Sequence, residues 1–271
     1  MKIKKIHILK SLIIIELIII IVGSFYIFDG KKKPSVLIVD IHGEIVGTTS
    51  PEAPNSDFWN RETNKVSAEE ITKILKKYEN DDNIKAFILD IDSNGGDIKS
   101  QSGLVQEIQQ MKKPVVAVVR DQALSSGYYL AAGTNRIFAN ELSNIADIGV
   151  TQIIEYDQNG NGQYRKCYIS SSEFKRMYYD DCPRFDKSKL YIEEKIRLIN
   201  STKLMAQEIA TFRNLPEEHV LNLADGTIFT GIGALKLGLI DEIGGLHNAV
   251  DWLKEELGMD LEILYYREIN Y

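Results

Sequence analysis

Apolar residues in this chain occur in two patterns that alternate from residue 34 onward. Near-continuous apolar runs rich in β-branched residues predict strands that are buried on both faces. These runs occupy residues 34–46, 84–92, 115–119 and 136–139. Gly43 interrupts the first run, and the polar, turn-rich stretch before Ser67 is expected to be a loop.

Between these runs, apolar residues recur at the three- and four-residue spacing of amphipathic helices. One helix is expected after Ser67, which forms a capping box with Glu70, and a second ends before Pro114. A third covers residues 190–212, with its apolar residues expected on one stripe: Ile192, Ile196, Ile199, Met205 and Ile209. A small-residue helix and a short strand follow within 230–245, and a terminal helix occupies 249–258.

Strands that alternate with amphipathic helices predict an α/β fold, a mostly parallel sheet with flanking helices. The chain of 271 residues is long enough for one sizeable domain of this kind with short annexes. We expect the domain at residues 34–258, a C-terminal tail at 259–271, and a separate N-terminal segment at 1–33.

The N-terminal segment has the pattern of a transmembrane helix, with lysines on both sides of an apolar run at residues 12–28. Seventeen helical residues reach roughly 26 Å, and Ile8 and Leu9 can extend the run toward the ~30 Å hydrocarbon core. The run is long for a cleaved signal peptide, which is the alternative, and no A-x-A pattern follows it. We therefore predict a single-pass anchor in the cell membrane, with the domain on the extracytoplasmic side.

Composition narrows the class of partner and cofactor. The formal net charge of −7 and the absence of a basic stripe disfavour nucleic acid. Cys167 and Cys182 have no further cysteine or histidine pair with which to form a zinc site, so we expect no metal. Outside the cytoplasm these two cysteines either form a disulfide or remain as free thiols.

Two loops that follow predicted strands carry residues suited to catalysis. Residues 93–96 (Ser-Asn-Gly-Gly) follow one strand, and residues 124–127 (Leu-Ser-Ser-Gly) follow the next. Open α/β sheets bind ligands at the carboxyl ends of their strands. A serine at a helix start exposes its hydroxyl, and glycines let a reacting carbonyl approach backbone N–H groups. The loops could supply a nucleophile and an oxyanion hole, and an ordinary glycine turn with a serine helix cap is the alternative.

The base that would activate such a serine is harder to find. The histidines are isolated in unrelated contexts: His7, His42, His219 and His247. A lysine can act as the base, because burial lowers the pKa of an amine. Lys175 lies among aromatic residues with Ser171 and Ser172 nearby, although a surface lysine at a helix start fits this local sequence as well.

Several motifs carry a family resemblance when they are taken together and in order: IDSNGGDIKS, KKPVVAVVRDQALSSGYYLAAGTNRIFAN, IADIGV, ISSSEFKR and LADGTIFTGIGALKLGLIDEIGG. They resemble the signal peptide peptidase A family, membrane-anchored bacterial serine peptidases with a Clp-protease or crotonase-like fold and a serine–lysine dyad. The resemblance covers roughly residues 35–257. It implies this fold, peptide substrates, no metal or organic cofactor, and a ring-shaped homo-oligomer whose dyad is completed between neighbouring protomers.

By position, the resemblance assigns the nucleophile to Ser125 and the general base to Lys175. It assigns the oxyanion hole to Gly95 or Gly96 together with the N–H of Ser126. Four residues stand where the family usually has proline, glycine, serine and glycine, in this order: Asn94, Ser126, Asp147 and Ser172. The carboxylate at position 147 is the departure with the clearest consequence, because an anion near the dyad favours a protonated lysine.

The function expected from the sequence is therefore a membrane-anchored serine endopeptidase that cleaves extended peptides, including signal-peptide remnants. Three alternatives stay open at this point. One is a related membrane peptidase that acts on stomatin-like proteins. The others are an acyl-CoA enzyme on the same scaffold and a non-catalytic member that keeps the fold.

Overall fold

The computed structural model describes residues 33–48, 59–60, 65–157, 164–172, 175 and 189–269. Residues 35–271 form one compact unit, and residues 1–34 form another. The predicted membrane span at residues 12–28 lies outside the described residues. Among the helices that the structure does describe, none is long and apolar enough to cross a bilayer.

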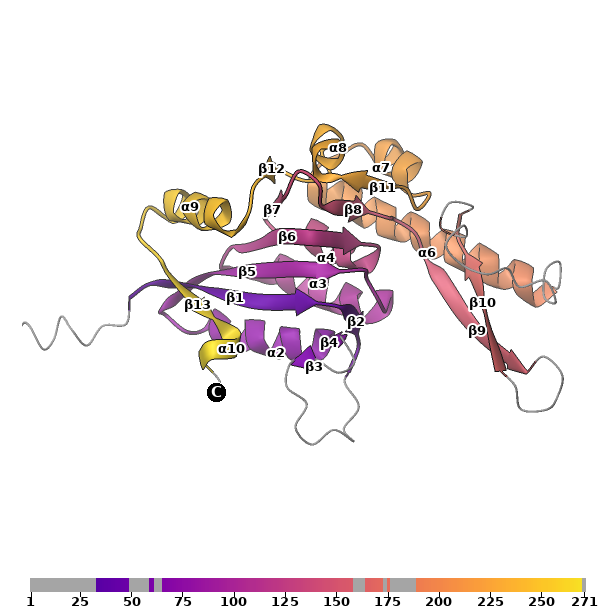
Figure 1. Ribbon diagram of the computed structural model, residues 1–271, viewed down its shortest axis with the longest axis horizontal. Coiled ribbons are helices and arrows are strands. Elements are labelled where there is room, and N and C mark those ends of the chain that lie inside the picture. Colours follow the sequence, from indigo (N-terminus) through magenta and orange to yellow (C-terminus); the bar gives the residue numbers. More distant parts are fainter. Residues whose placement is uncertain are drawn as a thin grey trace, which may run out of the picture. The chain divides into compact units, whose positions relative to one another are not determined.

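An eight-stranded sheet forms the centre of the compact unit (Figure 1). Its main path runs through β11 (Ile228–Thr230), β8 (Asn144–Ala146), β6 (Val115–Leu124), β5 (Ile84–Ser93), β1 (Ser35–His42) and β13 (Glu262–Tyr265). β7 (Arg136–Ala139) pairs with both β6 and β12 (Glu242–Ile243). Every pair in this sheet is parallel except β11 with β8. The prediction of a mostly parallel α/β sheet is confirmed.

Side chains alternate along each strand, so both faces of the sheet carry apolar residues. Helices cover both of these faces. Leu37 and Val39 of β1 belong to the larger core cluster. The helical residues of this cluster come mainly from α2 (Ala68–Glu79), α3 (Ile98–Gln110), α4 (Ser126–Ala132) and α6 (Lys189–Arg213). Val36 and Ile38 point to the opposite face and pack with α9 (Leu246–Leu257).

The remaining elements lie around this core: β2 (Glu44–Val46), β3 (Trp59–Asn60), β4 (Lys65–Ser67), α7 (Glu217–Leu223), α8 (Gly231–Lys236) and α10 (Tyr266–Ile269). The start of α2 confirms half of the predicted capping box. The Ser67 hydroxyl accepts a hydrogen bond from Glu70 N at 3.3 Å, whereas the Glu70 side chain accepts one from Lys73 Nζ at 2.6 Å. The exposed Lys73 ammonium offers an ion pair that a backbone N–H does not.

A two-stranded antiparallel hairpin stands apart from the large sheet. β9 (Thr151–Asp157) pairs with β10 (Tyr164–Ser170), and Thr151 lies opposite Ser170. The turn between the two strands and Cys182 lie outside the described residues, so the alternatives of a disulfide and two free thiols both stay open. The hairpin delivers the chain from the end of the large sheet to Lys175.

The predicted stripe of α6 was wrong, because its residues lie on two faces. Met205 and Ile209 are buried in the core, whereas Ile192, Ile196 and Ile199 are each about half exposed. Each residue of an α-helix advances by about 100°, so Met205, thirteen positions after Ile192, points to a different face of the helix. The N-terminal part of α6 therefore presents an apolar face outside the core of a single chain.

The C-terminal segment corrects the expected domain boundary. Residues 259–271 were expected to form a tail, but β13 pairs in parallel with β1, from Ser35 opposite Glu262 to Ile38 opposite Tyr265. β1 would otherwise leave its backbone groups unpaired at the sheet edge. The short run of alternating residues in β13 gave only a weak strand pattern in the sequence, and the neighbouring strand decided its conformation.

Candidate active site

Ser125 lies at the junction between β6 and α4 and has a strained backbone. Its φ of 54° and ψ of −126° are unusual for a residue with a side chain, and such strain persists only where the surrounding structure enforces it. The backbone N–H of Ser125 donates to Ala146 O at the end of β8 (2.7 Å). Ser125 occupies the cap position of α4, but its hydroxyl makes no capping hydrogen bond. The cap alternative is therefore wrong for this serine.

The neighbouring hydroxyl of Ser126 is already engaged. Ser126 is 1% exposed, and its Oγ accepts from Gln101 Nε2 (2.6 Å) and donates to Gly96 O (3.1 Å). Gln101 comes from α3, so this hydroxyl joins the first turn of α4 to α3 and to the glycine loop. The buried Ser126 hydroxyl is thus part of the scaffold, and the partly exposed Ser125 hydroxyl is the one that can meet a substrate.

The glycine loop approaches Ser125 closely. Gly95 has a φ of 101°, and a side chain there would lie 3.0 Å from Ser125 Cβ and 2.9 Å from Leu124 O. Gly95 N–H donates to Ser93 Oγ at 3.1 Å. Among the described residues, no hydrogen bond engages the N–H of Gly96 or that of Ser126. Of the two glycines expected for the oxyanion hole, Gly96 therefore keeps its donor available.

Lys175 is 4% exposed, and its Nζ lies beside Asp147. Nζ donates to Asp147 Oδ2 at 2.7 Å and to Asp147 O at 2.9 Å. Burial lowers the pKa of Lys175, and the Asp147 carboxylate opposes this effect. Burial also raises the pKa of Asp147, which Lys175 opposes. Both shifts favour a neutral amine on Lys175 and a neutral carboxyl group on Asp147 over an ammonium and a carboxylate.

These groups converge on one cavity of about 490 Å³. Its walls include every residue assigned to the site by resemblance: Gly95, Gly96, Ser125, Ser126 and Lys175, with Asp147 beside them. The Ser125 Oγ donates to Gly149 O at 3.3 Å, and a side chain at Gly149 would lie 2.9 Å from Lys175 Cδ. Ser125 and Lys175 thus flank the same glycine without a direct hydrogen bond between them. Within the described part of the chain, no histidine lines this cavity.

Ser125 and Lys175 of one chain both line this cavity, and the expectation that neighbouring protomers complete the dyad stays a prediction. Ser125 follows a strand of the large sheet, whereas Lys175 follows the β9–β10 hairpin. α4, β7, β8 and the hairpin lie between them in the sequence, and the chain then returns to the same cavity.

Three residues that support the site were not recognised in the sequence. Gly149 and Gly226 allow close approach, since a side chain at Gly226 would lie 2.9 Å from Lys175 N. Gln101 is fully buried together with Leu104, Val105 and Ile108. A glutamine at an apolar-face position of an otherwise amphipathic helix was the signal that could have indicated its role.

One group of residues outside the cavity has metal-like spacing. Ligand atoms of Asp40, His42 and Asp90 lie within 4.8 Å of one another. The Arg120 guanidinium already donates to both Asp90 oxygens, with Nε at 2.7 Å from Oδ1, and Arg267 lies 3.5 Å from Asp40. These arginines supply the positive charge that a metal ion would otherwise provide, so the group is accounted for as an ion-pair cluster.

Comparison with known proteins agrees with the geometry of the cavity. The model of peptidase family S49 matches residues 107–260, and the Clp protease model matches residues 56–145. The chain belongs to peptidase family S49. It is accordingly a serine peptidase, a hydrolase, with a Clp-protease-like fold. The predicted resemblance to signal peptide peptidase A is confirmed at this level.

Three relatives show how far the similarity of this S49 peptidase extends. "Putative signal peptide peptidase SppA" of Enterococcus faecium is 28% identical over 250 residues, which are 88% of this chain and 69% of the relative. "Serine protease SPPA, chloroplastic" of Arabidopsis thaliana is 28% identical over 72% of this chain and 29% of its own length. "Membrane-bound protease PH1510" of Pyrococcus horikoshii is 36% identical over 84 residues, 30% of this chain and 18% of the relative.

Proposed function

We propose that this S49 peptidase is a membrane-anchored endopeptidase that cleaves extended peptides, such as signal-peptide remnants, with a Ser125–Lys175 dyad. The observation that supports this most directly is the shared cavity. A strained serine without a capping bond and a buried lysine both border Gly149. A serine nucleophile needs a base within reach, and a desolvated amine can provide it.

The contacts of Lys175 fit the geometry of a neutral amine. A neutral amine has two N–H bonds and one lone pair. The two hydrogen bonds to Asp147 use both N–H bonds, which leaves the lone pair to accept the proton of the Ser125 hydroxyl. A rotation of the Ser125 side chain away from Gly149 O would complete this contact when substrate binds.

In the proposed reaction, Ser125 Oγ attacks the scissile carbonyl while its proton moves to Lys175 Nζ. The N–H groups of Gly96 and Ser126 stabilise the oxyanion of the tetrahedral intermediate. Lys175 then gives the proton to the leaving amine, and the peptide bond breaks to leave an acyl group on Ser125. Water, deprotonated by Lys175, hydrolyses this ester and restores the serine.

The cavity also supports peptide substrates in an extended conformation. Thr151, Gln152 and Ile153 of β9 line its wall, and β9 pairs only with β10 among the described strands. One edge of β9 therefore offers backbone groups that an extended peptide can pair with as an added strand. This geometry favours a peptidase over an enzyme that binds a compact thioester.

The dyad is tested by a fluorophosphonate probe, which reacts only with an activated serine. We expect labelling of the wild-type protein at Ser125, its loss in Ser125→Ala and Lys175→Met, and its retention in Ser126→Ala. Peptide mapping of the labelled residue is the measurement. Label on Ser126, or no label on a folded wild-type protein, would rule out the proposed dyad and favour a non-catalytic member of the family.

The membrane anchor is proposed from the apolar run at residues 12–28. The Pyrococcus horikoshii relative is named a membrane-bound protease, which is consistent with this proposal. We further propose that the domain lies outside the cytoplasm. Alkaline carbonate extraction should leave the full chain in the membrane pellet and release a chain that lacks residues 1–33. External protease should then reach the domain in spheroplasts.

A ring-shaped homo-oligomer remains part of the proposal. The exposed apolar face of α6, at Ile192, Ile196 and Ile199, is a surface that another copy could cover. Sedimentation of the anchor-free protein should show an oligomer that dissociates in the Ile196→Asp variant. Because Ser125 and Lys175 of one chain line the same cavity, we expect labelling of Ser125 to persist in the dissociated form.

A further inference from the structure

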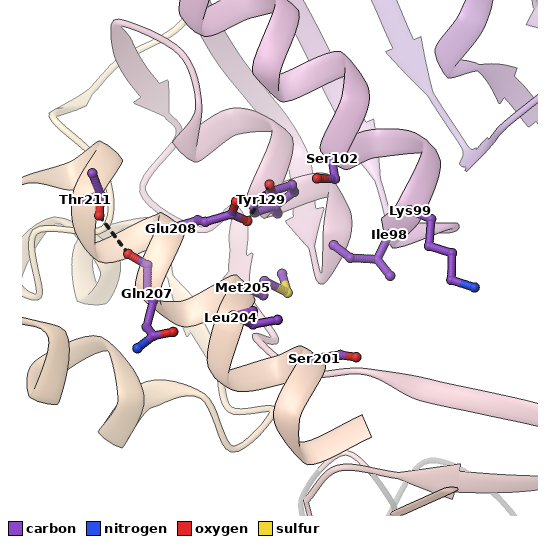
Figure 2. Close-up of a pocket in the computed structure, with 10 residues that line it drawn as sticks. All are labelled: Ile98, Lys99, Ser102, Tyr129, Ser201, Leu204, Met205, Gln207, Glu208 and Thr211. Atoms are coloured by element: carbon purple, nitrogen blue, oxygen red, sulfur yellow. Dashed lines mark hydrogen bonds between the residues drawn. The ribbon is translucent and has the colours of Figure 1, made fainter. Parts of the chain in front are cut away.

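A second cavity adjoins the catalytic one and is lined by α3, α4 and α6 (Figure 2). Its volume is about 530 Å³, within the range of small-ligand sites. Four residues line both cavities: Ile98, Lys99, Ser201 and Met205. The two cavities therefore adjoin each other at the end where α3 begins, directly after the glycine loop.

This adjoining cavity lies at a distance from Ser125 that a substrate side chain can span. Tyr129 forms part of its wall, and Tyr129 N–H donates to Ser125 O at 3.1 Å, one helical turn along α4. Four helical residues rise about 6 Å, which is close to the reach of an extended lysine or arginine side chain. A peptide bound at Ser125 can thus place one side chain in the adjoining cavity.

The two ends of the adjoining cavity differ in chemistry. Near the catalytic cavity, Ile98, Leu204 and Met205 provide apolar contacts. At the other end, Figure 2 shows Glu208 directed at Tyr129, whose hydroxyl donates to Glu208 Oε2 at 2.7 Å. Burial raises the pKa of Tyr129, so the hydroxyl stays neutral and remains a donor to the carboxylate. This bond holds the carboxylate in place and leaves its second oxygen for a ligand.

Charges around the adjoining cavity favour a cationic guest at the Glu208 end. Lys99 is the cation among the lining residues, and Figure 2 shows its side chain pointing away from Glu208. Lys99 interacts instead with Glu194. The pKa of Glu194 is lowered mainly by Arg197 and to a smaller extent by Lys99. In the part of the chain that the structure describes, no basic side chain bonds to Glu208.

We propose that the adjoining cavity is a specificity subsite that takes a lysine or arginine side chain of the peptide substrate. The apolar wall packs against the methylene groups of such a side chain, and Glu208 pairs with its charged end. The inference rests on the proposed peptidase function and deepens it by naming a substrate class, peptides with a basic residue near the scissile bond.

The test compares peptides that differ at one residue. A fluorogenic peptide carries lysine, norleucine or glutamate in turn at each position from the fourth residue before the scissile bond to the second after it. At one position we expect the wild-type enzyme to prefer lysine over norleucine by at least about tenfold in kcat/KM, the size of one charged hydrogen bond. The ratio of the two peptides cancels differences in active-enzyme concentration.

Variants then assign the preference to Glu208. In Glu208→Gln the amide oxygen can still accept from Tyr129, and the lysine-to-norleucine ratio should fall to about one. In Glu208→Lys the same position should prefer glutamate. Glu193→Gln is the matched control, because Glu193 is an exposed carboxylate of the same helix outside both cavities, and it should keep the wild-type ratio.

The outcomes separate this subsite from the peptidase proposal. If Ser125 is labelled and peptides are cleaved, but lysine is not preferred or the preference survives in Glu208→Gln, the subsite is wrong and the dyad stands. If the folded wild-type protein neither cleaves any peptide nor reacts with the fluorophosphonate, the peptidase proposal fails and the subsite fails with it.

Discussion

The serine side and the lysine side of the active site are built in different ways. Ser125 stands between β6 and α4, and all seven residues of α4 are buried. Lys175 follows a two-stranded hairpin outside the large sheet, and two contacts with Asp147 hold its amine. The core of the fold therefore positions the proposed nucleophile, whereas an ion pair with Asp147 positions the proposed base. Changes on the serine side should affect catalysis through geometry, and changes on the lysine side through protonation.

The largest effect is expected for Ser125→Ala, which removes the nucleophile. We expect kcat/KM to fall by at least about 10⁴-fold, because no other group can take over the role of the serine hydroxyl. Thermal unfolding should be nearly unchanged, because the hydroxyl makes one 3.3 Å bond to Gly149 O. Residual activity above about one per cent would show that another residue attacks the substrate.

Lys175→Met is expected to have the next largest effect, and it acts on both activity and stability. Activity should fall by roughly 10³-fold through loss of the base. Stability should fall by on the order of 2 kcal/mol, because Asp147 would keep a buried carboxylate without its partner.

A double variant separates these two effects. Lys175→Met with Asp147→Ser should recover most of the lost thermal stability and none of the activity. Thermal unfolding and peptide hydrolysis on the same samples provide the measurements. Recovery of activity in the double variant would contradict the assignment of Lys175 as the base.

Ser126→Gly should give a smaller loss that reports on the serine side. Removing the Ser126 hydroxyl breaks the connection from Gln101 to Gly96 O, and the oxyanion donor at Gly96 becomes less well positioned. We expect kcat to fall by about tenfold with little change in KM. Gln101→Leu should give the same loss in kcat, and unequal losses in the two variants would show that the hydrogen bonds do not act as one unit.

Asp147→Ser should give the smallest change at neutral pH and the clearest change in pH dependence. Burial lowers the pKa of Lys175, and the Asp147 carboxylate opposes this effect. Without the carboxylate, burial acts alone and the pKa of Lys175 falls further. The neutral base then persists to lower pH, so the acidic limb of the kcat/KM profile should move to lower pH. A limb that stays in place would mean that Asp147 does not control the proton on Lys175.

The sequence predicted the regular elements well where the pattern was long. The apolar run of β5 and the helix after Ser67 were found where expected. β6 begins where expected but continues to Leu124, five residues beyond its predicted end. Short segments were less predictable, and β13 was missed because four residues depend on a neighbouring strand for their conformation. The apolar residues of α6 were predicted to lie on one face, but their spacing along the helix places them on two faces.

The candidate site likewise combines features that the sequence predicted with features that it did not. The residue types at positions 95, 96, 125, 126 and 175 were recognised by resemblance. Their contacts were not, because the partners of Ser126 and Lys175 come from elements far apart in the sequence. The resemblance already assigned the nucleophile to Ser125, and the burial of Ser126, which local sequence does not report, supports this assignment. The choice between the two glycines depended on which N–H was already bonded.

By itself, the sequence determined the alternation of strands and helices and the family, and it nominated the candidate site residues, because these depend on local periodicity and on ordered motifs. Only the tertiary structure decided that Ser125 and Lys175 line one cavity, that Asp147 holds the amine of Lys175, and that Glu208 lines an adjoining cavity. Hydrogen bonds and burial are made by residues that meet through folding, so their consequences for pKa and specificity appear only when distant segments are packed together.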